Sequence, residues 1–338
     1  MKIGDRWILG SFQKDALFIF SPGIVGIVLA SFLPEKSISF VLFAFFTAVI
    51  VDSGHVYTTA WRTFFRKEEV SSHWRYWAVP LGIMVGVFLW VRFKIPYLWS
   101  FVVYATVYHH MTQFYGFLRW YQKLNGGGSA LSGRFLFALM IIPFILLHFR
   151  KLPNGGIYTN EDIFFYPNDR FFQIGMIFYV VAVLSWLGHE LLLIRNKTFK
   201  RGQFLAVLGP AILYGVCFLR GQNTVQVISP LLLSHGIPYM AVMDVSLPRI
   251  NPKLFSTVYK AIGIVAATAL IGGLIDLSFE STSIPISNEY VWTKVSVFNT
   301  LLIGIYLVPL LCHYIFDGVL WKSKHRDAKL IYQDQGPD

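Results

Sequence analysis

Long apolar segments recur along the whole chain and set the first limit on its fold. Each is close to the roughly 20 apolar residues that cross a bilayer as a helix. Ten such segments lie at about 16–34, 38–61, 76–93, 97–121, 135–149, 172–194, 203–219, 225–245, 255–277 and 295–320. Connections rich in Gly, Pro and Asn, such as "LNGGGSALSG" and "LPRINPK", separate them. The sequence therefore predicts an all-α, polytopic transmembrane helical bundle.

The composition supports this class of protein. Of the 338 residues, 55% are hydrophobic and only 14% are charged, against roughly 25% charged in soluble domains. The N-terminal "MKIGDRWILGSFQKD" is polar and runs directly into a span, so we expect the first segment to be retained rather than cleaved. We predict one integral membrane domain over residues 1–338, with a short cytoplasmic tail at about 322–338. The expected location is a bacterial inner membrane.

The distribution of basic residues predicts the orientation. With the N-terminus inside, 21 of the 29 Lys and Arg residues fall on the cytoplasmic side, as expected for a membrane protein. This bias predicts an N-in, C-in topology. The net charge of +11 then reflects topology and attraction to anionic lipid headgroups. We therefore expect membrane lipids, and not nucleic acid, as partners.

Six of the nine histidines share one depth in the predicted membrane. All six lie on even-numbered segments, at or beyond the middle of each: His55, His109, His110, His189, His235 and His313. Intramembrane ionisable residues are expensive and generally face a protein interior or a water-filled cavity. The shared depth predicts that these histidines converge on one site. We interpret His73, His148 and His325 as structural instead.

Carboxylates accompany several of these histidines at helical spacing. Asp52 precedes His55 by three residues in "DSGHV", and Asp317 follows His313 by four in "CHYIFDG", so each pair shares a helix face. Imidazole and carboxylate together suit iron, zinc, manganese or copper. We predict the metal ligands to be His55, His109, His110, His189, His235, His313, Asp52 and Asp317. The predicted supporting residues are Gln113, Glu190 and Tyr239.

The two cysteines exclude other kinds of site. Cys217 and Cys312 both lie inside apolar segments, so neither a disulfide framework nor a thiolate metal site is expected. A metal must therefore rely on nitrogen and oxygen ligands. We expect iron, as one or two ions, with zinc or haem as the alternatives.

The motifs "VYHHM", "DSGHV", "SHGIPY" and "CHYIFDG" carry a family resemblance. With the topology, they resemble the histidine-rich membrane iron enzymes: fatty-acid desaturases and hydroxylases, and carotene-cleaving dioxygenases of the Brp/Blh type. The resemblance implies iron that activates dioxygen. The chain lacks the HxxxH and HxxHH boxes of desaturases, and ten helices exceed their usual number, so no site residue is taken from those families.

The leading functional hypothesis is a membrane-embedded, iron-dependent oxidase or oxygenase acting on a hydrophobic, lipid-like substrate. Desaturation, hydroxylation and oxidative cleavage all fit this description, and an electron donor would be a further partner. A zinc-dependent intramembrane lipid hydrolase is an alternative, although it would use only about three histidines. A haem-binding electron-transfer protein or a proton-coupled transporter is another, although a transporter typically shows repeats and broken helices.

Overall fold

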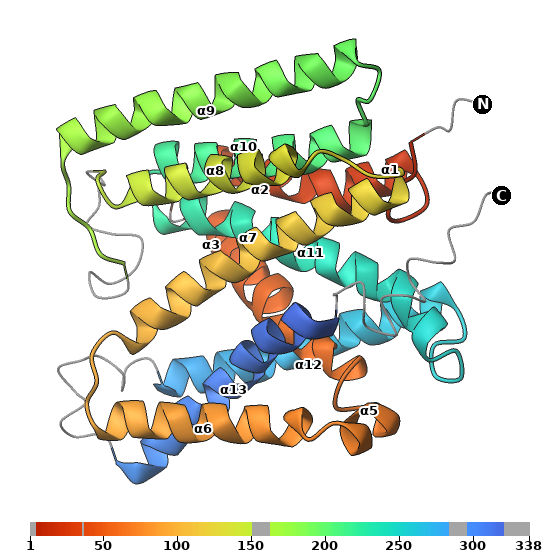
Figure 1. Cartoon of the computed structure of the whole chain (residues 1–338). Helices are drawn as coiled ribbons and strands as arrows, with labels where there is room; N and C mark the ends of the chain where they lie inside the picture. The colour runs from red at the N-terminus through yellow and green to blue at the C-terminus, as the bar shows by residue number, and fades with distance from the viewer. Residues whose placement is uncertain (1–4, 36, 151–162, 284–295, 321–338) are drawn as a thin grey trace. The chain divides into compact units, whose positions relative to one another are not determined.

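The computed structural model describes residues 5–35, 37–150, 163–283 and 296–320, and their regular structure is entirely helical (Figure 1). Its long helices are α6 (Arg75–Arg92), α7 (Leu98–Leu124), α8 (Ala130–Leu147), α9 (Asp169–Arg195), α10 (Arg201–Arg220), α11 (Thr224–Ile250), α12 (Val258–Ser283) and α13 (Val297–Leu320). The predicted all-α class is confirmed for these residues.

Two further long segments each consist of several helical pieces. The first joins α1 (Phe12–Asp15), η1 (Ala16–Phe20) and α2 (Ser21–Phe32). The second joins α3 (Ile38–Phe45), η2 (Phe46–Ser53), α4 (Gly54–Thr58) and η3 (Thr59–Trp61). The segments η1 and η2 are π-helical and η3 is a 3₁₀ turn. A short helix, α5 (Lys67–Ser72), follows the second segment.

Helical segments occur at or within a few residues of all ten predicted ranges. Eight of them are long and apolar enough to cross a membrane: those at residues 12–32 and 38–61, and helices α8 to α13. Helices α6 and α7 do not reach that level of hydropathy, and α7 carries the polar "HHMTQ" sequence. The number of spans and the N-in, C-in orientation stay predictions. The tail predicted at about 322–338 lies outside the described residues.

The chain divides into two compact units that are interleaved in sequence. Unit 1 comprises residues 1–44 and 99–238, and unit 2 comprises residues 45–98 and 239–338. The three boundaries fall inside helices: before the last residue of α3, after the first residue of α7, and within α11. The hydropathy pattern of the sequence does not reveal this division.

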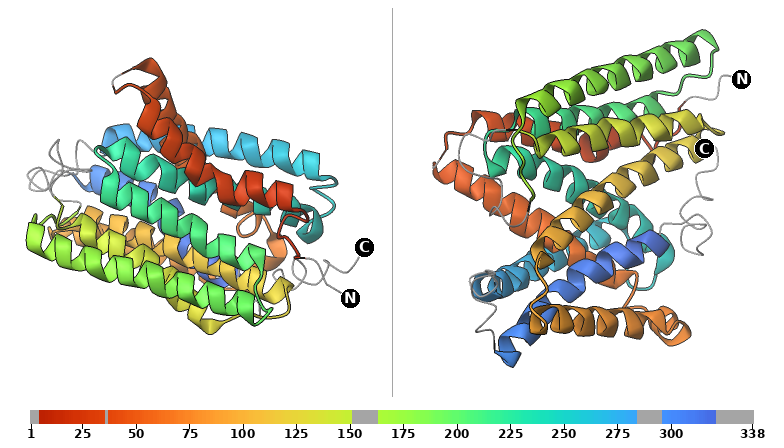
Figure 2. Two further views of the ribbon diagram at one scale, coloured as in Figure 1. Left: turned by 90° about the horizontal axis from the view of Figure 1, so that it is seen from above. Right: turned by 60° about the vertical axis from the view of Figure 1, so that its left-hand side comes forward.

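Unit 1 is built around α10. This helix packs on α8 and on α2, while α8 also packs on α9, which runs beside it in both views of Figure 2. Leu136, Leu139 and Met140 fill the buried side of α8. Helix α9 instead exposes apolar side chains such as Ile177 and Phe178, as expected of a lipid-facing helix.

A buried carboxylate fixes the start of unit 1. Asp15 accepts hydrogen bonds from the backbone N–H groups of Ile8 and Leu9, at 2.8 and 2.7 Å. It also accepts one from the Tyr121 hydroxyl on α7, at 2.5 Å. Three donors therefore satisfy the oxygens of a fully buried carboxyl group, as a buried polar group requires.

Unit 2 packs α13 against α6, and α12 against η2 and α4. Tyr76, Cys312, Phe316 and Leu320 form an apolar cluster between α6 and α13. Gly54 lies against the backbone of Ala269, and a side chain there would collide with that backbone. This close approach brings the polar face of α4 into the interior of the unit.

Candidate metal centre

The structure places the sequence-predicted residues in two groups, one in each unit. His55, His313, Asp52, Asp317 and Tyr239 belong to unit 2. His109, His110, His235 and Gln113 belong to unit 1, where they join α7 to α11. The interactions within each group define its chemistry.

A change in helix type positions Asp52 and His55. The Gly54 N–H donates to the Val49 carbonyl, five residues back, which is the π-helical pattern of η2. Such π turns inside helices are frequently found at functional sites. The α-helix resumes at Gly54, and Nδ1 of the next residue, His55, lies 3.9 Å from Oδ1 of the partly exposed Asp52. The predicted i, i+3 pair is therefore present on one helix face.

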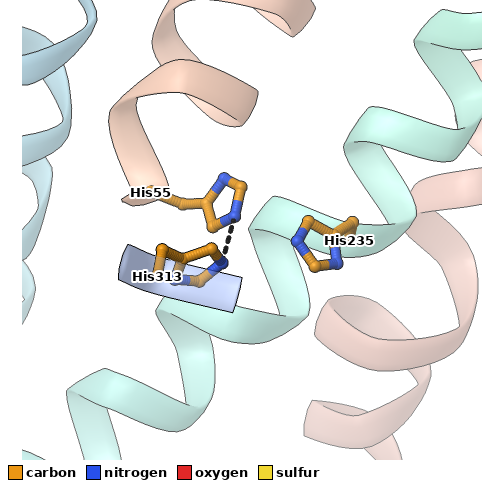
Figure 3. Close-up of side chains that lie close together, drawn as sticks. All are labelled: His55, His235 and His313. Carbon is orange, nitrogen blue, oxygen red and sulfur yellow. Dashed lines mark hydrogen bonds between the residues drawn. The ribbon is translucent and has the colours of Figure 1, made fainter. Parts of the chain in front are cut away.

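His55 and His313 face each other in the interior of unit 2 (Figure 3). Their Nε2 atoms are 3.2 Å apart, and their rings are nearly perpendicular, at 80°. Each side chain is only 1% exposed. The two residues are 258 positions apart in sequence, so this contact depends on the packing of α13 near α4.

The second nitrogen of His55 has a backbone partner. Its Nδ1 lies 3.0 Å from the Val51 carbonyl oxygen. A carbonyl can only accept a hydrogen bond, so the proton of the neutral imidazole is on Nδ1. The Nε2 atom of His55 consequently carries a lone pair.

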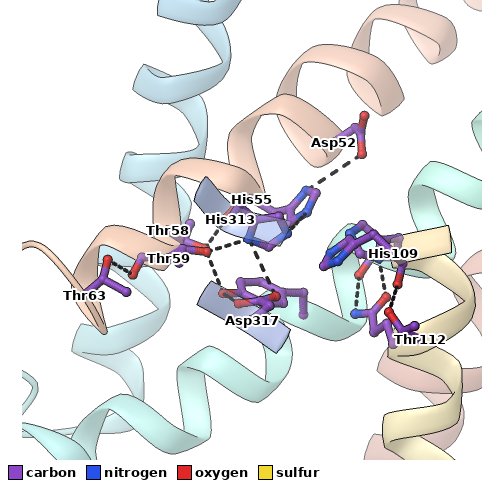
Figure 4. A network of polar contacts seen from close by, with 12 residues as sticks. Asp52, His55, Thr58, Thr59, Thr63, His109, Thr112, His313 and Asp317 are labelled. Carbon is purple, nitrogen blue, oxygen red and sulfur yellow. Dashed lines mark hydrogen bonds and ion pairs between the residues drawn. The ribbon is translucent and has the colours of Figure 1, made fainter. Parts of the chain in front are cut away.

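A chain of hydrogen bonds fixes the proton of His313 in the same way (Figure 4). With Asp317 ionised, the Tyr239 hydroxyl donates to its Oδ1 at 3.2 Å. The Tyr239 oxygen then accepts from the Thr59 hydroxyl at 2.7 Å. Because Thr59 has used its only proton, its oxygen accepts from His313 Nδ1–H, also at 2.7 Å.

The two Nε2 atoms lie 3.2 Å apart, within hydrogen-bond distance, and with both protons on Nδ1 each of them would present a lone pair instead. Two lone pairs at this distance repel unless a cation lies between them. Two nitrogens bound to one ion at about 2.0–2.1 Å lie roughly 2.9–3.4 Å apart for bond angles of about 90–110°. The observed separation of the two histidines matches that of a pair of metal ligands.

The two carboxylates lie behind the imidazoles rather than in front of them. Asp317 Oδ2 is 3.6 Å from His313 Nδ1, and Asp52 is likewise on the Nδ1 side of His55. At these distances the carboxylates do not accept the Nδ1 protons, which go to the Val51 carbonyl and the Thr59 hydroxyl, but a nearby negative charge favours a cation at the imidazoles. The sequence leaves Asp52 and Asp317 as either ligands or supporting residues, and their places on the Nδ1 side of the imidazoles are consistent with the supporting role.

The unit 1 group centres on His235 and Gln113. The Gln113 amide donates to the His235 backbone carbonyl at 3.1 Å, and its oxygen accepts a short hydrogen bond from His235 Nδ1. This pair of bonds again leaves the lone pair on Nε2. The ring of His110 stacks on that of His235 at 4.1 Å, and His109 meets it edge-on at 5.0 Å. All three histidines are buried.

His189 and Glu190 have other neighbours within unit 1. His189 lies against α8, with Nε2 3.4 Å from the Ser132 hydroxyl and its ring next to Phe135. Glu190 accepts a hydrogen bond from the Trp186 indole at 3.1 Å. Among the described residues, neither belongs to a group of three or more ligand atoms lying within 4.8 Å of one another.

His148 has the contacts of a structural residue. Its two ring nitrogens lie 2.8 Å from the Phe144 carbonyl oxygen and 2.7 Å from the Tyr104 hydroxyl. Burial lowers its pKa below the ordinary histidine value. This histidine is at the end of α8, outside the span, and serves well as a comparison for the candidate ligands.

Thr59 is the residue of the site that the sequence analysis missed. It lies four residues after His55, which is the spacing of a shared helix face, and this was its only signal in the sequence. Its role depends on contacts with α11 and α13 that periodicity cannot show.

No known protein family, curated protein or solved structure matches this chain. The function must therefore be argued from the site itself.

Proposed function

We propose that the protein is a membrane-embedded metalloenzyme whose metal ion binds to Nε2 of His55 and His313. The observation that carries the proposal is the 3.2 Å separation of the two buried Nε2 atoms, together with the separate partner that each Nδ1 atom has, the Val51 carbonyl for His55 and the Thr59 hydroxyl for His313. Asp52 and Asp317 lie 3.9 and 3.6 Å from the Nδ1 atoms of His55 and His313, so two acidic groups are close to the proposed ion site. A site built only for packing has no need of this arrangement.

The ligand chemistry is compatible with iron, which we propose as the ion because the sequence motifs resemble those of membrane iron enzymes. Imidazole nitrogen suits iron, zinc and copper, whereas thiolate ligands would indicate another kind of site. Cys312 adjoins His313 in sequence, but it packs in the apolar cluster with Tyr76 and Phe316. Bound iron would supply dioxygen activation and electron transfer. We therefore propose oxidation of a hydrophobic, lipid-like substrate, with an electron donor as partner.

The surrounding residues would keep the site in one protonation state. Thr59 and Tyr239 hold the His313 proton on Nδ1, and the Val51 carbonyl does the same for His55. Burial excludes bulk water from both imidazoles. The prediction that the unit 1 histidines are further ligands rests on the shared membrane depth that the sequence predicts for them.

A proton shared by the two histidines is the second candidate, because 3.2 Å is also a hydrogen-bond distance. This arrangement would suit a proton-coupled transporter rather than an enzyme. Haem between the same pair is disfavoured, since axial nitrogens on opposite sides of one iron would be about 4 Å apart on bonds of about 2 Å.

Elemental analysis of the purified protein, together with an absorption spectrum, tests the proposal. We expect iron at one or two ions per chain, and its loss in His55→Ala and His313→Ala. The His148→Ala variant is the matched control and should keep its metal, because both nitrogens of His148 already have other partners. Zinc alone would favour a hydrolase, a Soret band would favour haem, and a folded protein without metal would favour the shared proton.

The same measurement separates the contributions of the two units. His109→Ala and His235→Ala should also lower metal content if the unit 1 histidines are ligands. Full retention of metal in both variants would limit the ligand set to unit 2.

A further inference from the structure

Tyr239 of unit 2 has different neighbours at its hydroxyl and at its ring. The hydroxyl donates to Asp317 Oδ1 at 3.2 Å and accepts from the Thr59 hydroxyl at 2.7 Å. The ring lies edge-on to both proposed ligands, with its centroid 5.5 Å from that of His55 and 5.1 Å from that of His313. This side chain therefore contacts a proton acceptor and both imidazoles of the proposed ion site.

The hydrogen bond to Asp317 gives the Tyr239 proton a destination. A tyrosine gives up an electron readily only when its phenolic proton can leave with it, because the protonated radical is a strong acid. Bulk water cannot accept this proton, since the Tyr239 side chain is only 3% exposed. Asp317 lies within the roughly 2.6–3.2 Å that a proton acceptor requires. Thr59 donates to the same phenolic oxygen and can continue to do so once the proton has left.

Apolar side chains enclose the other side of the Tyr239 ring. Met243, Leu247 and Phe255 belong to the same buried cluster of unit 2. They keep bulk water and dissolved reductants away from the ring. An oxidised Tyr239 would therefore be protected until an electron reaches it.

Unit 2 contains a second tyrosine and carboxylate pair that does not face the histidines. The Tyr57 hydroxyl donates to Asp276 Oδ1 at 3.3 Å. Tyr57 follows His55 by two residues, a spacing at which side chains on a helix do not face each other, and its ring lies against Gly272 of α12. The contact with both proposed ligands thus distinguishes Tyr239 from a tyrosine that is only hydrogen-bonded to a carboxylate.

We propose that Tyr239 is a redox-active residue that supplies one electron to the ion bound by His55 and His313. The role rests on the proposed function, because dioxygen, which first oxidises the ion, is the source of oxidising power. Tyr239 then loses one electron, the oxidised ion gains it, and the phenolic proton passes to Asp317. The products are a neutral tyrosyl radical, a carboxylic acid and an ion reduced by one electron. One electron from the external donor, with the proton returned by Asp317, restores the tyrosine and the carboxylate.

Freeze-quench electron paramagnetic resonance spectroscopy tests this proposal. The purified full-length protein is saturated with ferrous ion without oxygen, mixed with buffer that contains dioxygen, and frozen at intervals. We expect an organic radical signal in the wild type, and its hyperfine splitting should change when the protein is produced with ring-deuterated tyrosine. This isotope comparison needs no substitution, so it remains decisive if a variant does not fold.

Two matched pairs of variants locate the radical. Tyr239→Phe keeps the ring but has no phenolic group, so the signal should be lost, whereas Tyr57→Phe should keep it. Asp317→Asn should lower the signal about tenfold, because the amide cannot take up the proton and a hydrogen bond to a charged group is weakened. Asp276→Asn should leave the signal unchanged, since Asp276 is the partner of Tyr57 instead.

Iron analysis of the same samples separates this role from the proposed function, and each radical signal is expressed per bound iron. Bound iron without a radical, a radical that is insensitive to tyrosine deuteration, or an equal signal in Tyr239→Phe overturns the redox role alone. A Tyr239 hydroxyl with only a structural role predicts weaker iron binding in Tyr239→Phe and no radical in the wild type. Wild-type protein that binds no iron overturns the metalloenzyme and the redox role together.

Discussion

The substitution Thr59→Val removes one hydroxyl from the centre of the unit 2 network while keeping the shape of the side chain. That hydroxyl accepts from His313 Nδ1 and donates to Tyr239, each at 2.7 Å. Without it, the proton of His313 is free to move to Nε2, where it would block a metal ion. We therefore expect Thr59→Val to weaken metal binding by more than the loss of one hydrogen bond alone would.

The expected magnitude follows from the position of Thr59 behind a ligand. Loss of such a supporting partner typically weakens metal binding about 10- to 100-fold. This range corresponds to about 1.4–2.8 kcal/mol. A lost hydrogen bond to a buried group amounts to a similar ~1–3 kcal/mol, so the two estimates agree.

Competition with a chelator of known affinity measures this change in purified protein. Thr268→Val is the matched control, because it removes the partner of the Trp61 indole, 2.9 Å away in the same unit, without touching either histidine. We expect a metal Kd raised 10- to 100-fold in Thr59→Val and unchanged in Thr268→Val. A Kd within about twofold of wild type in Thr59→Val would refute the derived proton positions.

Three further outcomes are expected. Asp15→Ala should lower the free energy of unfolding by about 2–3 kcal/mol, because it leaves two backbone N–H groups and the Tyr121 hydroxyl without their acceptor. It should not alter metal content. Unfolding in mixed detergent measures the change in stability, and an unchanged stability would contradict the prediction. Gly54→Val should lower the thermal midpoint through collision with Ala269, whereas Gly82→Val, in open space, should not. His148→Ala should keep the metal content of the wild type, and a loss as large as that in His313→Ala would show that depth in the membrane selected the wrong histidines.

Hydropathy was sufficient to locate the helices, because the bilayer requires a length and a composition that are visible in one dimension. The predicted ends of the helices were less accurate. The prediction began the fifth segment at residue 135, whereas α8 begins at Ala130, after Ser129 caps it by accepting from the Leu131 N–H. The charged Arg134 resembles a loop residue by hydropathy, although it lies on an exposed face of the helix.

Pairs within one helix were predictable, and pairs between helices were not. The spacing of His55 from Asp52, and of His313 from Asp317, was enough to place each pair on one face. The facing of His55 and His313 depends on how helices distant in sequence pack, and on the π turn before His55. Membrane depth also predicted His189 as a ligand; in the structure its ring nitrogen lies 3.4 Å from the Ser132 hydroxyl of α8, and its role as a ligand stays a prediction.

X-ray absorption spectroscopy at the metal edge, on protein purified without added metal, tests the central claim most directly. We expect a bound ion with a nitrogen and oxygen shell at about 2.0–2.2 Å, with scattering from imidazole rings and with no sulfur. This signal should disappear in the His55→Ala, His313→Ala double variant. A folded wild-type protein without metal, or an ion whose shell survives the double substitution, would contradict the account.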